Sequence, residues 1–257
     1  YAGKAGMVDQ GAFDHLDAAM MTHPSSSDRI GSGSSANKHF TAVFHGKAAH
    51  AAAAPEQGIN ALDAAILFFN NVNALRQHLR EDARVHGIIT KGGTRSNVIP
   101  DLAEIQVGVR SLDESYLDEV LTRVKDCARS AGRATGARVR IRMSEQWYRS
   151  YKINSPLDDC LVQGFADAGI ELNRGSGRDG RGSLDMANVS RVIPAAHPYF
   201  NIVPSGRKAP GLHTTEFRDL SNTDFAYRRA LDAGTGLALC ACRILKQKPL
   251  LGRIRKG

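Results

Sequence analysis

The sequence predicts an α/β protein that is interrupted by a compact α+β unit. Residues 38–145 show strand and helix patterns in the order β-α-β-β-α-β, which is typical of a split-βαβ, ferredoxin-like sandwich. The segments on either side also show strand and helix patterns, but neither completes a domain of familiar type. We therefore predict one partial α/β domain from residues 1–30 and 146–257, with residues 31–145 inserted into it.

The elements of the inserted unit follow from the spacing of apolar residues. Alternating apolar residues between Phe40 and Phe44 predict a strand, and apolar residues at helical spacing from Leu62 to Leu79 predict a helix. The remaining elements are predicted at 84–93 (strand), 102–110 (strand), 114–132 (helix) and 137–143 (strand). Ser111 and Glu114 have the spacing of a capping box at the start of the second helix.

The flanking segments are less regular. A predicted strand at residues 16–22 ends at His23-Pro24, and residues 25–38 are rich in serine and glycine, so we predict a linker there. After Trp147, the patterns predict helices at 157–168 and 223–245 and a strand region at 192–203.

Composition limits the functional classes. The 257 residues are 42% hydrophobic and 23% charged, as in ordinary globular domains. The apolar runs stay well below the ~20 residues that a membrane helix needs, so we predict no membrane partner. The four cysteines lack metal-site spacing, and we expect reduced thiols in a cytoplasmic protein.

The net charge of +8 raises the question of a nucleic-acid partner. Arg138, Arg140 and Arg142 alternate with apolar residues, which favours a strand with one solvated basic face. Because no aromatic stacking platform or recognition helix accompanies these arginines, we predict no nucleic-acid partner.

Two histidines stand where an α/β domain builds its site. His23, before Pro24, and His213, in "GLHTTEF", lie at the ends of predicted strands. Imidazole binds zinc well at neutral pH, but zinc usually takes three or four protein ligands. Spacing alone therefore leaves a His23/His213 metal site open.

Four motifs, in order, resemble one enzyme family. They are "GKAAHAAAAPEQGINALDAA" (46–65), "GGTRSNVIPDLAEIQVGVRS" (92–111), "GSLDMANVSRVIPAAHPYF" (182–200) and "GLHTTEF" (211–217). Together they are similar to the zinc amidohydrolase and metallopeptidase family of aminoacylase, carboxypeptidase G and p-aminobenzoyl-glutamate hydrolase. The resemblance implies a partial zinc-peptidase-like catalytic domain with an inserted ferredoxin-like lid that forms a homodimer.

The resemblance also implies a set of site residues. These are His23 and His213 as metal ligands, His50 as a catalytic residue that reaches the partner subunit's site, and Asn97, Arg110, Gly182, Ser183 and Asp185 as substrate-binding residues. Simpler roles stay open for several of them. Asn97 could only shape a turn, Arg110 could only occupy a strand face, Asp185 could only cap a helix, and Gly182 could only permit curvature. His197 is interpreted as structural.

The implied function is metal-dependent hydrolysis of a small-molecule amide: an N-acyl amino acid, a p-aminobenzoyl-glutamate-like compound or a dipeptide. The intact family member is expected to hold two zinc ions. Residues 1–24 lack the Glu-Glu pair and the His-x-Asp motif that the family carries, so we expect a C-terminal portion that is inactive alone. The alternative is a truncated remnant, or a non-catalytic subunit that dimerises.

Overall fold

The computed structural model describes residues 3–145, 147–175 and 182–257, which divide into two units. Unit 1 comprises residues 1–34 and 151–257, and unit 2 comprises residues 35–150. The sequence-based boundaries lie after residues 30 and 145. No helix in the described ranges is long and apolar enough to cross a bilayer.

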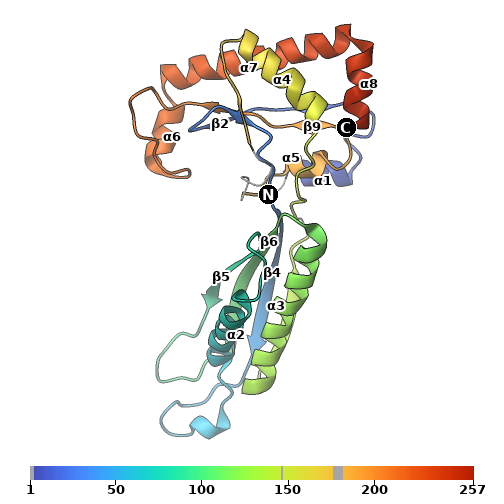
Figure 1. Cartoon of the computed structure of the whole chain (residues 1–257). Helices are drawn as coiled ribbons and strands as arrows, with labels where there is room; N and C mark the ends of the chain where they lie inside the picture. Colours follow the sequence, from blue (N-terminus) through green and yellow to red (C-terminus); the bar gives the residue numbers. More distant parts are fainter. Residues whose placement is uncertain (1–2, 146, 176–181) are drawn as a thin grey trace. The chain divides into compact units, whose positions relative to one another are not determined.

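Unit 2 is a four-stranded antiparallel sheet with two helices on one face (Figure 1). Its elements are β4 (Ala36–His45), the short 3-10 helix η1 (Pro55–Gln57), α2 (Ala61–Arg76), β5 (Arg84–Lys91), β6 (Leu102–Ser111), α3 (Glu114–Thr135) and β7 (Arg138–Met143). The strand order β5-β6-β4-β7 is that of a ferredoxin-like sandwich, so the predicted fold class is confirmed. Phe40 and Phe44 of β4 are fully buried under α2 and α3.

Asn60 and Asp113 cap the N-termini of the two helices of unit 2. Oδ1 of Asn60 accepts from the backbone N of Leu62 at 3.0 Å, and Oδ1 of Asp113 accepts from the backbone N of Ser115 at 2.9 Å. The predicted capping box was wrong. Ser111 stays paired as the last residue of β6, and its hydroxyl donates to Asp82 Oδ2 at 2.6 Å instead.

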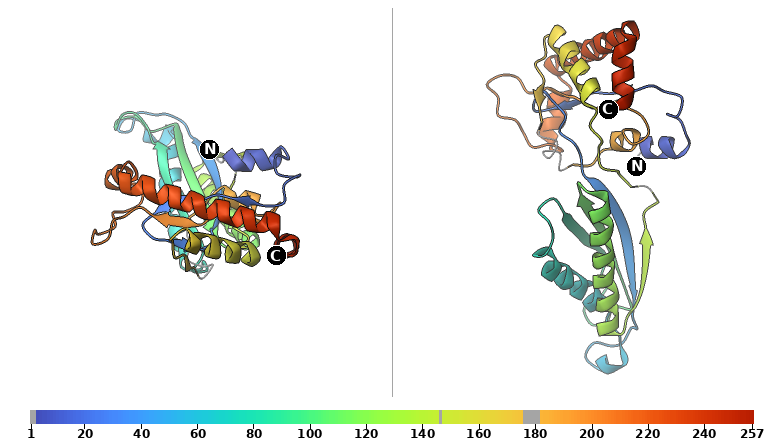
Figure 2. Two further views of the ribbon diagram at one scale, coloured as in Figure 1. Left: turned by 90° about the horizontal axis from the view of Figure 1, so that it is seen from above. Right: turned by 45° about the vertical axis from the view of Figure 1, so that its right-hand side comes forward.

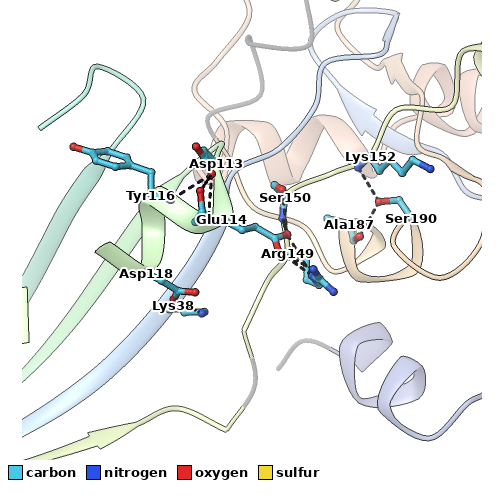
Figure 3. A network of polar contacts seen from close by, with 11 residues as sticks. Lys38, Asp113, Glu114, Tyr116, Asp118, Arg149, Ser150, Lys152, Ala187 and Ser190 are labelled. Atoms are coloured by element: carbon cyan, nitrogen blue, oxygen red, sulfur yellow. Dashed lines mark hydrogen bonds and ion pairs between the residues drawn. The ribbon is translucent and has the colours of Figure 1, made fainter. Parts of the chain in front are cut away.

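The Glu114 carboxylate does not serve in the predicted capping box and instead binds the last residues of unit 2 (Figure 3). Its carboxylate accepts from Arg149 Nη2 at 2.8 Å and from the backbone N of Ser150 at 2.9 Å. Arg149 also lies 5.5 Å from the Trp147 ring. A charged, two-point contact of this kind holds the last residues of unit 2 against the start of α3.

Unit 1 is built from short strands contributed by distant parts of the chain. Those strands are β1 (Ala19–Met20), β2 (His23–Ser25), β3 (Arg29–Ile30), β8 (Asn173–Arg174), β9 (Ala195–Ala196) and β10 (Tyr199–Asn201). β1 pairs in parallel with β9, and a second sheet has the order β2-β10-β3-β8. The predicted strand regions before His23 and at 192–203 therefore pair with each other.

The prediction of a linker at residues 25–38 was wrong. Its first residue completes β2, β3 lies inside it, and β4 begins at Ala36. The contacts of Asp28 explain why this segment has a defined structure. Its Oδ1 accepts from the backbone N of Asn201 at 2.7 Å and from Arg229 Nη2 at 2.6 Å. This ion pair is largely shielded, and it ties the serine-rich segment to β10 and to the last long helix.

The helices of unit 1 are α1 (Gly3–Asp9), α4 (Ser155–Asp167), α5 (Met186–Val189), α6 (Thr215–Ser221), α7 (Asp224–Lys246) and α8 (Lys248–Lys256). α4 and α7 lie side by side (Figure 2). Two glycines permit this contact: a Cβ on Gly164 would lie 2.6 Å from the carbonyl oxygen of Gly236, and a Cβ on Gly236 would lie 2.5 Å from the ring of Phe165. The fully buried Phe165 cannot easily yield.

We predict that Gly236→Ala destabilises unit 1, because the added methyl group overlaps the Phe165 ring. The expected loss in the free energy of unfolding is roughly 1–3 kcal/mol, as for overpacked cores. Gly234→Ala is the matched control on the same helix, since no described atom beyond the backbone of its own helix lies within 4 Å of the added Cβ. It should gain roughly 0.5–1 kcal/mol from helix propensity. Urea unfolding of both variants tests this, and equal stabilities would refute the close helix contact.

Candidate functional site

His23 is the predicted metal ligand on β2, and its ring orientation is defined. Its Nδ1 lies 2.7 Å from the carbonyl oxygen of Pro24. Because a carbonyl only accepts, Nδ1 carries the hydrogen, and in the neutral imidazole Nε2 keeps its lone pair. The side chain is exposed. His23 therefore presents the atom that a metal, or a donor group of a ligand, requires.

His197 lies beside His23, although sequence analysis interpreted it as structural. The two ring centroids are 5.9 Å apart, and the His197 ring also lies 4.7 Å from that of Tyr199. The proximity results from strand pairing, because Tyr199 of β10 pairs in register with His23 of β2. His197 Nδ1 is buried and has no hydrogen-bond partner among the described residues. Burial, together with nearby His23, lowers the pKa of His197 to about 4, so its imidazole is neutral at pH 7.

Asp185 lies close enough to His197 for its negative charge to oppose the lowering of the His197 pKa. It precedes α5 but makes no side-chain capping bond, so the capping alternative was wrong. Its carboxylate instead accepts from the backbone N of Lys4 at 3.0 Å and lies 2.9 Å from Lys4 Nζ. Burial opposes ionisation, but these bonds to Lys4 lower the pKa of Asp185, which stays charged.

Gly182 and Ser183 precede Asp185. Gly182 is exposed, and no atom of the described residues lies within 4 Å of a Cβ added to it. Ser183 is half-buried and makes a polar contact. Their predicted role in substrate binding stays a prediction.

His213, the second predicted metal ligand, has an unusual backbone. Its φ of 65° is the one positive value among non-glycine residues in the described ranges. Histidine tolerates this left-handed region better than most residues, yet the conformation costs energy. The following residue holds the loop: Thr214 Oγ1 donates to the carbonyl of Gly211 at 2.8 Å and accepts from the backbone N of Phe217 at 3.2 Å. The exposed His213 therefore has a defined place directly before α6.

His50 and Asn97, predicted from separate motifs, lie on adjacent segments of unit 2. His50 forms a backbone bridge with Val98, and the backbone N of Ala51 donates to the carbonyl of Asn97 at 3.0 Å. His50 Nδ1 accepts from the backbone N of Ala53 at 3.1 Å. Since Nδ1 accepts, the hydrogen of the neutral ring is on Nε2, and this exposed atom is free to donate. The backbone N–H groups of the neighbouring alanines thus fix the tautomer of His50, and their small side chains leave space around its ring.

Arg110 lies at the other end of β6 from Asn97. The eight residues of strand between Leu102 and Arg110 correspond to roughly 27 Å at about 3.4 Å per residue. The structure therefore brings His50 and Asn97 together but not Arg110. Arg110 pairs in register with Asn37 of β4 and Arg84 of β5, so the strand-face alternative for Arg110 describes its position correctly.

The donor set in the described residues contains no group of three or more His, Cys, Asp or Glu side chains with metal-site spacing. Zinc takes nitrogen, sulfur and carboxylate ligands, usually three or four of them from protein. The Nε2 atom of His23 and the imidazole of His213 fit such a metal chemically. Their role as ligands stays a prediction.

Comparison with known proteins agrees with these motifs. Residues 31–135 match the family model of the M20 peptidase dimerisation domain. The chain is 34% identical over 256 residues to the mouse Xaa-Arg dipeptidase, and this match covers 99% of the chain but 58% of the mouse protein. It is also 34% identical over 170 residues to one of the subunits of p-aminobenzoyl-glutamate hydrolase from Escherichia coli, covering 65% of the chain and 35% of that protein. The chain thus spans about half the length of such relatives.

Solved structures share the fold. A crystal structure of an aminobenzoyl-glutamate utilization protein from Klebsiella pneumoniae superposes with a TM-score of 0.66 at 24% identity, over 91% of this chain and 57% of the other. An amidase of the hydantoinase/carbamoylase family from Burkholderia vietnamiensis gives a TM-score of 0.64 at 17% identity, over 93% of this chain and 55% of the other. At these identities the likeness shows the fold alone.

Asp158, a residue that sequence analysis missed, is a buried carboxyl in the first turn of α4. Only 2% of it is exposed, and its Oδ2 lies 3.4 Å from the position of a Cβ on Gly31. Burial raises the pKa of Asp158 to about 7, although nearby Arg174 opposes the shift. Its usual value is 3.8, so the native state holds a proton that the unfolded chain has already lost between these two pH values.

This difference predicts a pH-dependent stability. As pH rises from about 4 to about 7, the free energy of unfolding should fall by up to roughly 4 kcal/mol, since a tenfold change in an acid dissociation constant corresponds to about 1.4 kcal/mol. Asp158→Asn resembles the protonated acid and should remove most of this decline. The variant should be more stable than the parent chain at pH 8 and similar at pH 4. Denaturant unfolding across this range tests the prediction, and parallel pH profiles would contradict it.

Proposed function

Because this chain belongs to the M20 amidohydrolase and peptidase family, we propose that it forms part of a metal-dependent enzyme that hydrolyses amide bonds. The proposed substrates are N-acyl amino acids, p-aminobenzoyl-glutamate-like compounds or dipeptides. The names of relatives cover both acidic and basic amino acids, as in glutamate conjugates and Xaa-Arg dipeptides. The family therefore leaves the substrate of this chain open.

The geometry of His23 is the observation that carries the proposal. The Pro24 carbonyl holds Nδ1, so Nε2 faces outward with a free lone pair, which is the arrangement of a metal-binding histidine with its second nitrogen fixed. Neutral His197 and ionised Asp185 lie in the same region. We assign His23 and His213 as ligands of a divalent metal, with zinc as the expected ion. When bound, the metal would supply an activated water and polarise the amide carbonyl.

His50 contributes a hydrogen-bond donor. Its Nδ1 is occupied by backbone N–H groups, so Nε2–H is available to stabilise negative charge that develops on the carbonyl oxygen of the amide. Asn97 lies on the neighbouring segment and carries a second polar group at the same end of the unit. In the proposed homodimer, the residues of one lid serve the site of the other subunit.

The activity of the complete gene product that contains these residues tests the proposal. Release of amine should be measured from p-aminobenzoyl-glutamate, an N-acetyl amino acid and a dipeptide, with and without added zinc. His23→Ala and His213→Ala should each lower kcat by at least about 100-fold, because each removes a ligand of the ion that activates water. His15→Ala, an exposed histidine of unit 1, is the matched control and should keep full activity.

Full activity of the His213→Ala protein would remove the metal assignment. A stable dimer that hydrolyses none of these amides would instead support the non-catalytic dimerising subunit.

The second test concerns self-association through unit 2. Ile66 of α2 and Ile89 of β5 are 46% and 38% exposed, and β5 is an edge strand with unpaired backbone groups. We predict a dimer in sedimentation velocity at micromolar concentration, and we predict that Ile66→Glu combined with Ile89→Glu yields monomers. Leu245→Glu on α7, where the parent residue is 83% exposed, should leave the dimer intact. A monomeric parent chain would exclude His50 from acting across subunits.

A further inference from the structure

Two cysteine thiols meet in the core of unit 1, on the two helices that pack most closely there. Cys160 of α4 and Cys240 of α7 are free thiols, and they are 6% and 0% exposed. The Sγ of Cys240 donates to the Sγ of Cys160 at 2.9 Å, and the Sγ of Cys160 donates to the carbonyl oxygen of Cys240 at 3.6 Å. A disulfide bond joins its sulfurs at about 2.05 Å. The two sulfurs therefore need to approach by only about 0.9 Å to be joined.

The glycines of the helix contact bring the two thiols together. Gly164 follows Cys160 by one turn of α4, and Gly236 precedes Cys240 by one turn of α7, so each glycine shares a helix face with its cysteine. A Cβ on Gly164 would lie 3.2 Å from the backbone N of Cys240 and 3.4 Å from its Cβ. The helices therefore approach closely enough for two short side chains to touch. Because the core around them is close-packed, neither sulfur can easily move away from the other.

The surroundings of the pair favour a thiolate at Cys160. The hydrogen bond from Cys240 lowers the pKa of the Cys160 thiol, and although burial opposes this shift, the charge of Arg243 supports it. The hydrogen bond to Cys160 and burial raise the pKa of Cys240, which therefore keeps its proton. The Nη2 atom of Arg243 pairs with Asp167, but its Nη1 is buried and has no hydrogen-bond partner among the described residues. A cation beside a thiol stabilises the thiolate, which is the nucleophilic form of cysteine.

We propose that Cys160 and Cys240 form a redox-modification site, which hydrogen peroxide converts into a disulfide bond between α4 and α7. The Cys160 thiolate attacks one oxygen of the peroxide, the O–O bond breaks, and the departing hydroxide takes up a proton to become water. The Cys240 sulfur then attacks the sulfenic acid formed on Cys160. The hydroxyl group leaves with the Cys240 proton as a second water. The two thiols thus lose two electrons and two protons, and the peroxide is reduced to two waters.

The disulfide would stabilise the framework that carries the candidate site of unit 1. It joins two helices whose cysteines are 80 positions apart, and a cross-link that closes a long loop restricts the unfolded chain strongly. The α7 helix also carries Arg229, which donates to Asp28 and to the carbonyl oxygen of Asn201 on β10. Oxidation is therefore expected to stabilise unit 1 and to leave its strand pairing intact. This modification goes beyond the proposed hydrolysis and does not depend on it.

The test uses Cys127→Ala combined with Cys242→Ala, which keeps only Cys160 and Cys240 as thiols. Dilute hydrogen peroxide should remove both thiols of the folded protein, as counted in denaturant, and peptide mapping should find Cys160 linked to Cys240 within one chain. The thermal unfolding midpoint should rise by about 5 °C or more and return after treatment with dithiothreitol. Adding Cys240→Ala should abolish both the link and the rise. Peptide mapping of the oxidised parent chain, in which no residue is changed, should show the same link.

The rate of oxidation tests the role of Arg243. Arg243→Gln should slow the loss of thiols about tenfold at pH 7, because it removes the charge that favours the thiolate. Asp167→Asn is the matched control, since it removes the same ion pair but keeps the guanidinium, and it should not slow the reaction.

Three results would overturn the proposal: thiols that persist in peroxide, oxidation to sulfinic acids or to links between chains, and a linked protein whose unfolding midpoint does not rise. These measurements need neither metal nor substrate. Their failure would therefore leave the hydrolase proposal standing, and a failed hydrolysis assay would leave the modification site standing.

Discussion

The parallel pairing of β2 with β10 is the constraint on which the candidate site in unit 1 depends. It sets Tyr199 opposite His23, and so brings His197 and the His23 imidazole within 5.9 Å of each other, measured between ring centroids. Asp28 secures the pairing through the backbone of Asn201 and the guanidinium of Arg229. Without these contacts, a two-residue strand such as β3 would contribute too few hydrogen bonds to stay ordered. The position of His23 beside His197 therefore depends on contacts between residues that are far apart in the sequence.

In unit 2, the packing of the sheet against its helices determines where the polar side chains lie. Its sheet buries large apolar side chains on one face, which fixes the register of every strand and therefore the polar residues of the other face. A slip by one residue would move Arg110 and His39 into the core. Glycine at position 108 and alanines around His50 then decide how closely other groups approach. The rigid core places the side chains, and the small residues make them accessible.

The sequence predicted unit 2 more accurately than unit 1, because local periodicity determines long strands and helices. Residues 25–38 were missed as structure since their order comes from Asp28, whose partners lie far along the chain. The capping box failed because Ser111 remained in a strand. Motifs predicted functional roles for His23 and Asp185 in unit 1 and for His50 in unit 2, and these roles stay predictions. No local signal indicated that burial would leave His197 neutral or that Arg84 would face Arg110.

We propose that His23 and His213 bind one divalent metal. A crystal structure of the complete gene product grown with zinc, with anomalous data collected at the zinc absorption edge, tests it most directly. We expect a zinc peak bonded to Nε2 of His23 and to the imidazole of His213, with the His23 Nδ1 bond to Pro24 retained. Zinc peaks that contact neither histidine would contradict it.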